Sequence, residues 1–313
     1  MEQRDLGATG VRVSRVILGC GNFGGIGSSP AFFGQGESRE QAFALLDAAW
    51  DAGITTLDTA DAYGGGRSEA YIGDWLRTRG PDVRDHVVLS TKTFNPMEEG
   101  ADHGLSPGRV RRQVESSLGR LGVERVDMFL THAWDVEVPI AETAGVFDEL
   151  VSAGKIGAYG LSNVDGERLR EGLAAGSFGW VQNSYSLLDR EVEDEVLPLC
   201  AERGLGFTPF SPLAGGWLTG KYRRGEEPPE GSRMTKRPEP YRHLDVDDVY
   251  DALDELAELG DPATLALAWL LAAPDVTAIV VGPRRAQHLE PALAALASPL
   301  GEYERSELSE LFA

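Results

Sequence analysis

The chain has 313 residues, of which 42% are hydrophobic, and this is enough for one large domain or two ordinary ones. Its 29 basic and 50 acidic residues give a formal charge of −21, which repels nucleic-acid phosphates and anionic lipids and argues against both as partners. The two cysteines, Cys20 and Cys200, supply neither a disulfide framework nor metal-ligand spacing. No secretion-signal core and no apolar run of the ~18 residues of a membrane span is present, so we expect a cytoplasmic protein.

Short apolar runs alternate with amphipathic segments along nearly the whole chain, which is the pattern of strands followed by helices. The expected strands are residues 16–18, 55–57, 87–90, 126–130, 156–161, 180–182, 206–208 and 278–281. The expected helices are residues 38–52, 68–78, 107–121, 140–153, 167–175, 191–202 and a group from residue 247 onward. Eight such parallel units fit a closed (β/α)8 TIM barrel better than an open doubly wound sheet. No linker is visible, so we expect a single domain over residues 1–313.

Two segments depart from this alternation. Residues 4–6 and 11–13 flank Gly7-Ala8-Thr9-Gly10, which is typical of a β-hairpin, and such a hairpin could plug the bottom of the barrel. Residues 212–244, after the seventh strand, are rich in glycine, proline and charge and show no period. A loop of that length inside a compact domain is usually either functional or disordered.

The stretch Gly19-Cys-Gly-Asn-Phe-Gly24 follows the first expected strand and matches the dinucleotide-binding pattern G-x-G-x-x-G. In a Rossmann fold these glycines open a helix whose N-terminus holds the pyrophosphate. Here Gly25-Ile-Gly-Ser-Ser-Pro30 comes next, and the following helical pattern starts only near Ser38. We therefore reject the Rossmann interpretation, and the glycines instead suit a loop that passes close to a ligand.

Polar side chains stand where consecutive expected strands end, which is where barrel enzymes place their catalytic residues. Asp58 follows the second strand with Tyr63 in the next loop, Lys92 closes the third strand, and His132 closes the fourth. A lysine ammonium lowers the pKa of a neighbouring phenol, an aspartate keeps that lysine charged, and a neutral histidine can orient a substrate oxygen. The set predicts protonation of an alkoxide that forms as a hydride arrives.

Each of these residues also has a structural interpretation. Asp58 could cap a loop, Tyr63 could be an exposed loop aromatic, and His132 could be a hydrogen-bonded core histidine. Lys92 is harder to explain in this way, because a lysine that closes an apolar strand is otherwise a poorly placed charge. Their convergence on three neighbouring strand ends favours a catalytic site.

Leu57-Asp-Thr-Ala-Asp-Ala-Tyr-Gly64 closely resembles the D-T-A-x-x-Y-G signature of the aldo-keto reductase superfamily. Further stretches resemble that family's motifs in order along nearly the whole chain: 120–127, 154–157 with 160–163, 182–189, and 210–222, the last similar to the cofactor loop of bacterial members and of potassium-channel β subunits. The resemblance implies an NADP-dependent reductase of aldehydes or ketones. It also implies that Asp58, Tyr63, Lys92 and His132 form a catalytic tetrad, with Tyr63 as proton donor.

The same resemblance implies that NADPH, with NADH as an alternative, binds across the barrel mouth. The residues it assigns to the cofactor are Gly21, Asn22, Phe23, Asp58, Ser162, Asn163, Gln182, Phe210, Ser211, Leu213, Gly215, Lys221, Gly282, Arg284 and His288. In this assignment Ser162, Asn163 and Gln182 hold the carboxamide and Phe210 stacks on the nicotinamide.

The adenosine end is less regular. Lys221 would contact the pyrophosphate, and Arg284 could bind a 2′-phosphate by a bidentate contact. Pro291 and Ala292 replace the family's usual Glu-Asn pair that contacts adenine, which weakens the assignment of NADP over NAD. Arg284 and Arg285 could also be a solvated helix start.

An aromatic-lined mouth suits an apolar or aromatic carbonyl substrate. The candidate substrate residues are Phe23, Phe33, Tyr63, Phe94, His132 and Trp134, with Asn22 nearby and Trp217 further round. Core packing is an equally good interpretation of these aromatics. Residues 25–36, the segment least like the family average, are a second candidate for shaping specificity.

Two other functions remain open from the sequence. A cofactor-binding regulatory subunit with slow or no turnover, as in channel β subunits, would share the cofactor motifs. A metal-dependent barrel hydrolase would use Asp58 and His132, but the sequence lacks clustered metal ligands, and we expect no metal. We expect a small-molecule carbonyl as the only partner, and a monomer or weak homo-oligomer.

Overall fold

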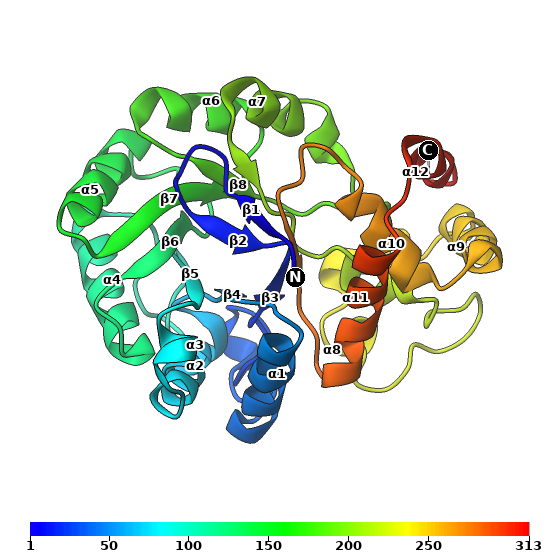
Figure 1. Ribbon diagram of the computed structural model, residues 1–313, viewed down its shortest axis with the longest axis horizontal. Helices are drawn as coiled ribbons and strands as arrows, with labels where there is room; N and C mark the ends of the chain where they lie inside the picture. Colours follow the sequence, from blue (N-terminus) through cyan, green and yellow to red (C-terminus); the bar gives the residue numbers. More distant parts are fainter. Residues whose placement is uncertain (313) are drawn as a thin grey trace.

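The computed structural model describes residues 1–312, and its centre is a sheet of eight parallel strands (Figure 1). Neighbouring strands along the chain pair with each other, and the last strand pairs with the first. Backbone hydrogen bonds from Thr277 N to Phe207 O (2.8 Å) and from Val280 N to Pro209 O (2.9 Å) join the two edges, so the sheet closes into a barrel. The strands are β3 (Val16–Gly19), β4 (Thr56–Asp58), β5 (Val88–Thr93), β6 (Val126–Thr131), β7 (Ile156–Ser162), β8 (Trp180–Gln182), β9 (Gly206–Phe207) and β10 (Ile279–Val281).

Helices surround this barrel (Figure 1). Their starts carry the expected capping chemistry: Ser38 and Gln41 form a capping box, and Asp261 accepts a hydrogen bond from Thr264 N ahead of Pro262. The helices are α1 (Arg39–Asp51), α2 (Arg67–Arg77), α3 (Pro81–Arg84), α4 (Pro107–Leu121), α5 (Ile140–Ser152), α6 (Gly166–Ala175), α7 (Val196–Arg203), α8 (Arg233–Lys236), α9 (Asp247–Leu259), α10 (Pro262–Leu271), α11 (Glu290–Ala297) and α12 (Glu302–Glu310). The predicted TIM barrel is therefore confirmed, with element ends shifted by a few residues.

The predicted N-terminal hairpin is present and closes the bottom of the barrel. Its strands, β1 (Gln3–Asp5) and β2 (Arg12–Ser14), lie one residue outside the expected bounds. Leu6 and Val13 are fully buried in a cluster with side chains of the barrel interior: Ile17, Met128, Leu130, Trp180, Ala278 and Val280. At Gly7, which has φ +53°, an added Cβ would lie 2.4 Å from Gly206 N, so the turn packs directly against the start of β9.

The long segment after β9 is folded. It contains the 3-10 turns Ala214–Thr219 and Glu239–Leu244 and the short helix α8. Two of its aromatic side chains, Trp217 and Tyr222, are buried, and their ring centres lie 5.0 Å apart. Trp217 therefore packs in the core, and the suggestion that it borders the substrate stays a prediction.

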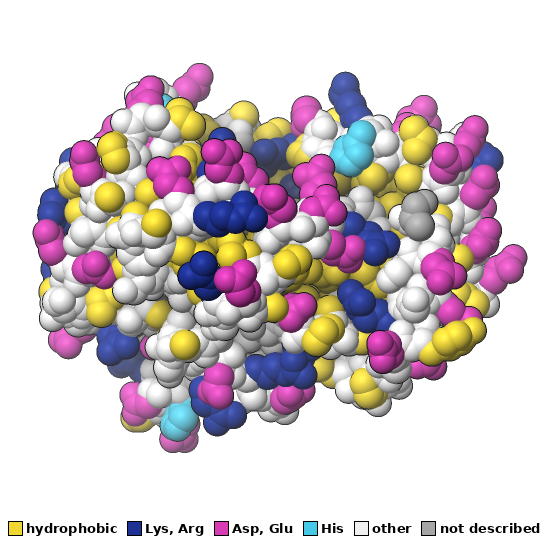
Figure 2. All heavy atoms as spheres, turned by 90° about the horizontal axis from the view of Figure 1, so that it is seen from above, with side chains coloured by type: hydrophobic (Ala, Val, Ile, Leu, Met, Phe, Trp, Pro, Cys, Tyr) yellow, Lys and Arg dark blue, Asp and Glu magenta, His cyan; other side chains and the backbone are white. Residues whose placement is uncertain are grey.

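The surface carries the excess of acid. Figure 2 shows aspartate and glutamate side chains spread over one face, with arginine and lysine side chains among them. Within residues 1–312, no helix has the length and apolar character needed to span a bilayer.

Candidate active site

The four tetrad residues come from three neighbouring strands and one tight turn. Asp58 is the last residue of β4, Lys92 is the last but one of β5, and His132 directly follows β6. Tyr63 opens the 3-10 turn Tyr63–Gly66, in which all three glycines have φ between +59° and +88°. Only glycine adopts that conformation readily, so the glycine run is what turns the chain back into α2 immediately after Tyr63.

Lys92 and Asp58 form an ion pair that is almost completely shielded from solvent. Lys92 Nζ lies 2.5 Å from Asp58 Oδ2 and also donates to Thr59 O at 2.9 Å. The other carboxylate oxygen of Asp58 accepts from Ser90 Oγ (3.0 Å) and Gln182 Nε2 (3.2 Å). Burial lowers the pKa of Lys92, but Asp58 and Tyr63 reverse this effect and raise it above the usual lysine value. The lysine is therefore a fixed ammonium group.

Tyr63 lies against both Lys92 and His132. Lys92 Nζ is 5.3 Å from the centre of the tyrosine ring, and the histidine ring meets it edge-on at 5.3 Å. Burial raises the pKa of Tyr63, and although Lys92 acts in the opposite direction, the net pKa stays above the usual value. The expectation that the lysine makes this phenol more acidic than free tyrosine is wrong, because burial is the larger effect. At neutral pH Tyr63 holds its proton.

His132 is neutral, as the sequence predicted. Burial, followed by the charge of Lys92, lowers the pKa of His132 to about 3. Its backbone is fixed on both sides, because its N–H donates to Thr93 O (2.9 Å) and its carbonyl accepts from Asn163 Nδ2 (2.8 Å). Its ring Nδ1 is buried and has no hydrogen-bond partner within residues 1–312.

The residues assigned to the nicotinamide lie at the same end of the barrel. Ser162 and Gln182 are paired in register at the ends of β7 and β8. Asn163 and Ser211 have φ of 58° and 54°. This conformation costs a non-glycine residue of order 1 kcal/mol and is found preferentially at ligand sites. The Gln182 amide is bonded to Asp58, so this residue connects the tetrad to the residues assigned to the nicotinamide.

A group of cationic side chains, here called the basic cluster, comprises Lys221, Arg233, Arg284, Arg285 and His288. Burial, then Arg233 and Arg284, lowers the pKa of Lys221. Burial, then Arg285, Lys221 and Arg284, lowers the pKa of His288. Lys221 is thus influenced by the charges of Arg233 and Arg284, and His288 by those of Arg284, Arg285 and Lys221. In a chain of charge −21, such a concentration of positive charge favours an anion over a cation as a ligand.

The comparisons with known proteins agree with this geometry. The model of the Aldo/keto reductase family matches residues 15–313. The chain belongs to this family. Among its relatives, an uncharacterized oxidoreductase, YrpG, of Bacillus subtilis (strain 168) is 36% identical over 100% of this chain and 96% of its own length. The NADH-specific methylglyoxal reductase of Escherichia coli (strain K12) is 34% identical over 99% and 98%.

A solved structure of another member supports the fold of this aldo/keto reductase. The glycerol dehydrogenase AKR11B4 from Gluconobacter oxydans superposes with a TM-score of 0.83 at 25% identity, covering 99% of this chain and 94% of its own. The chain is therefore an oxidoreductase of this family, whose members use nicotinamide cofactors.

The reductase's candidate substrate aromatics divide into two sets. Phe23 is 1% exposed and belongs to the main core, which agrees with the packing interpretation for this residue. Phe33, Phe94 and Trp134 are partly exposed. The Phe94 ring also meets the ring of His103, which the sequence analysis did not select, edge-on at 6.0 Å.

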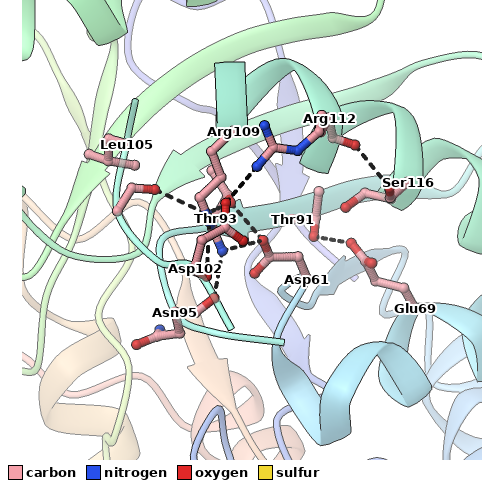
Figure 3. A network of polar contacts seen from close by, with 12 residues as sticks. Asp61, Glu69, Thr91, Thr93, Asn95, Asp102, Leu105, Arg109, Arg112 and Ser116 are labelled. Atoms are coloured by element: carbon pink, nitrogen blue, oxygen red, sulfur yellow. Dashed lines mark hydrogen bonds and ion pairs between the residues drawn. The ribbon is translucent and has the colours of Figure 1, made fainter. Parts of the chain in front are cut away.

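A buried polar network that the sequence analysis missed lies around Thr91 and Thr93 of β5 (Figure 3). Arg109, 1% exposed, donates to Thr93 Oγ1 (2.7 Å) and to Asn95 O (2.6 Å). Thr93 in turn donates to Asp61 Oδ2 (2.6 Å), and the Asp61 N–H donates to Lys92 O (3.0 Å). The network thus ties the end of β5 to the segment that leads into Tyr63.

Other residues of the site also escaped prediction. Tyr241 packs its ring against Gly215, where an added Cβ would lie 2.6 Å away, and its hydroxyl is 3.4 Å from Ser211 Oγ. Arg233 belongs to α8. Both come from the aperiodic loop, which carried no sequence signal beyond its composition. Within residues 1–312, no group of three or more His, Cys, Asp or Glu side chains is placed to hold a metal ion.

Proposed function

We propose that this protein reduces aldehydes or ketones to alcohols with NADPH as the preferred cofactor. The observation that carries the proposal is the buried Asp58–Lys92 ion pair beside the protonated Tyr63. When bound, a reduced nicotinamide supplies the hydride that reaches the carbonyl carbon. Tyr63 Oη gives its proton to the carbonyl oxygen, on which negative charge develops as the C–H bond forms.

The other tetrad residues support that proton transfer. Lys92 holds a positive charge beside the tyrosine oxygen, so the phenolate that remains after transfer is stabilised. Asp58 keeps the lysine charged and aimed. His132 is neutral over the whole physiological range and can orient the substrate oxygen by a hydrogen bond from its ring.

The residues present fit a phosphorylated dinucleotide. The basic cluster offers the positive charge that a pyrophosphate and a 2′-phosphate need, and Arg284 can make the bidentate contact that a phosphate prefers. Phe210, Ser211, Leu213 and Gly215 lie along the segment between the nicotinamide residues and Lys221. NADH remains the second candidate, because a relative that is 34% identical is named as NADH-specific.

For the substrate, the partly exposed Phe94 and Trp134, each two residues after a tetrad residue, favour a small carbonyl compound with an apolar side. We expect the reductase to act in the cytoplasm as a monomer or weak homo-oligomer.

The decisive test is Tyr63→Phe, which removes only the acidic hydroxyl. Turnover of 4-nitrobenzaldehyde with NADPH should fall by about 10²–10⁴, the usual contribution of a general acid. Cofactor affinity, followed by tryptophan fluorescence, should stay close to that of the unmodified protein. Tyr303→Phe, on the exposed surface of α12, is the matched control and should keep full turnover. Near-normal turnover of Tyr63→Phe would defeat the proposed mechanism, and less than one turnover by the unmodified protein would favour a regulatory subunit.

A further inference from the structure

Glu37 is a buried carboxylate that neither the tetrad nor the proposed cofactor contacts explain. It is 4% exposed and lies between β3 and α1, just before the Ser38 cap. Its backbone forms a bridge with Phe23: the Glu37 N–H donates to Asn22 O (2.8 Å), and its carbonyl accepts from Gly24 N (2.9 Å). The position of this side chain is therefore fixed by the loop that follows β3.

The two oxygens of Glu37 have different environments. Oε1 accepts from Arg284 Nε at 2.7 Å, and Oε2 is buried with no hydrogen-bond partner within residues 1–312. Arg284 also donates from Nη1 to Gly231 O (3.0 Å) in the long loop, and its side chain is 50% exposed. A buried carboxylate oxygen without a donor is costly, so Oε2 is a site that favours a hydrogen-bond donor and repels an anion.

We propose that Glu37 sets the cofactor preference of this reductase by competing with the 2′-phosphate of NADPH for Arg284. This inference rests on the proposed function, in which Arg284 lies beside the 2′ position of the adenosine ribose. A phosphate there meets an arginine that is already paired and a carboxylate of its own sign. A ribose 2′-hydroxyl, as in NADH, carries no charge, so it needs no arginine and is not repelled by Glu37; acidic residues favour NAD over NADP in other dinucleotide sites as well.

The consequence is a reductase that accepts both cofactors, with a preference for NADPH much smaller than its basic cluster alone would produce. In a purely structural role, the Glu37–Arg284 pair would only connect the β3 loop to the β10 loop. Loosening such a connection would weaken the binding of both cofactors equally and leave the ratio of their affinities unchanged.

The test is Glu37→Gln, which keeps an oxygen for Arg284 and removes the charge. The dissociation constants of NADPH and NADH are measured by tryptophan fluorescence, together with kcat/KM for each cofactor. We expect the preference for NADPH over NADH to rise about tenfold, the size of one charge-assisted contact. Glu171→Gln, an exposed position on the outer helix α6, is the matched control and should leave the preference within about twofold, since surface charges contribute little.

An unchanged preference in Glu37→Gln, with both cofactors still bound, overturns the inference but leaves the proposed function intact. If Glu37→Gln does not fold, Arg284→Met is compared with the double variant Glu37→Gln/Arg284→Met, in which no buried charge lacks its partner. The double variant should favour NADPH more strongly than Arg284→Met does, and equal preferences overturn the inference. If the unmodified protein binds neither cofactor, the proposed function itself fails.

Discussion

The tetrad and the basic cluster lie on the same side of the barrel but are built in different ways. The tetrad is carried by strand ends, and its ion pair is almost fully buried. Asp58 and Lys92 form their other hydrogen bonds with residues in the strands or directly after them, such as Ser90 and Thr59. The basic cluster is carried by loops and short helical turns, and its Arg284 contacts segments distant in sequence, at Gly231 and Glu37. The difference fits the roles we propose: proton transfer requires fixed positions, whereas phosphate binding mainly requires positive charge in the right region.

The largest expected effect comes from removing the charge inside the tetrad. Lys92→Met should lower kcat by about 10²–10⁴, because the phenolate left by proton transfer loses its cationic neighbour. It also leaves Asp58 buried and unpaired, which costs about 3–5 kcal/mol of unfolding free energy. Turnover and thermal unfolding are measured together. Lys155→Met, which removes one partner of the surface ion pair with Glu115, is the control and should change both only slightly. Full activity of Lys92→Met would show that the tetrad does not work as a unit.

A smaller and different effect is expected from the basic cluster. Lys221→Met should weaken cofactor binding about tenfold, since one contact to a phosphate is lost, and should leave kcat at saturating cofactor nearly unchanged. The measurement is the KM and the dissociation constant for NADPH at two salt concentrations. Lys236→Met, an exposed lysine of the same long loop, serves as control. A large fall in kcat with normal cofactor binding would mean that the division between the two regions is wrong.

The smallest expected effect is that of pH on kcat for reduction. The pKa of Tyr63 is raised, so the acid keeps its proton through neutral pH and loses it only above the usual tyrosine value. The pKa of His132, lowered to about 3, keeps the histidine neutral from acidic to alkaline conditions. Activity measured from pH 5 to 9 should therefore be nearly flat. An inflection near pH 7 would contradict these assignments and point to Asp61, whose pKa burial raises to about 7.

The sequence predicted the tetrad because barrel topology fixes where strand ends point, so Asp58, Lys92 and His132 could be chosen from three apolar runs alone. It could not predict Glu37 facing Arg284 or Arg109 bonded to Thr93, because no periodic pattern relates these segments. Nor could it predict the net pKa of Tyr63, in which burial and the lysine charge act in opposite directions. Phe23 looked like a residue of the mouth from its loop position, but its side chain turns into the core.

The position of the N-terminal hairpin bears on the order in which the chain folds. Its two strands precede the other elements of the described chain, but the partners of Leu6, among them Trp180 and the start of β9 at Gly206, lie far along the sequence. Contacts between such distant segments form slowly, because a long stretch of chain must first be brought together. Leu6 and Val13 therefore gain their full set of partners only when β10, which carries Val280, is in place. The hairpin is thus among the last elements to reach its final environment.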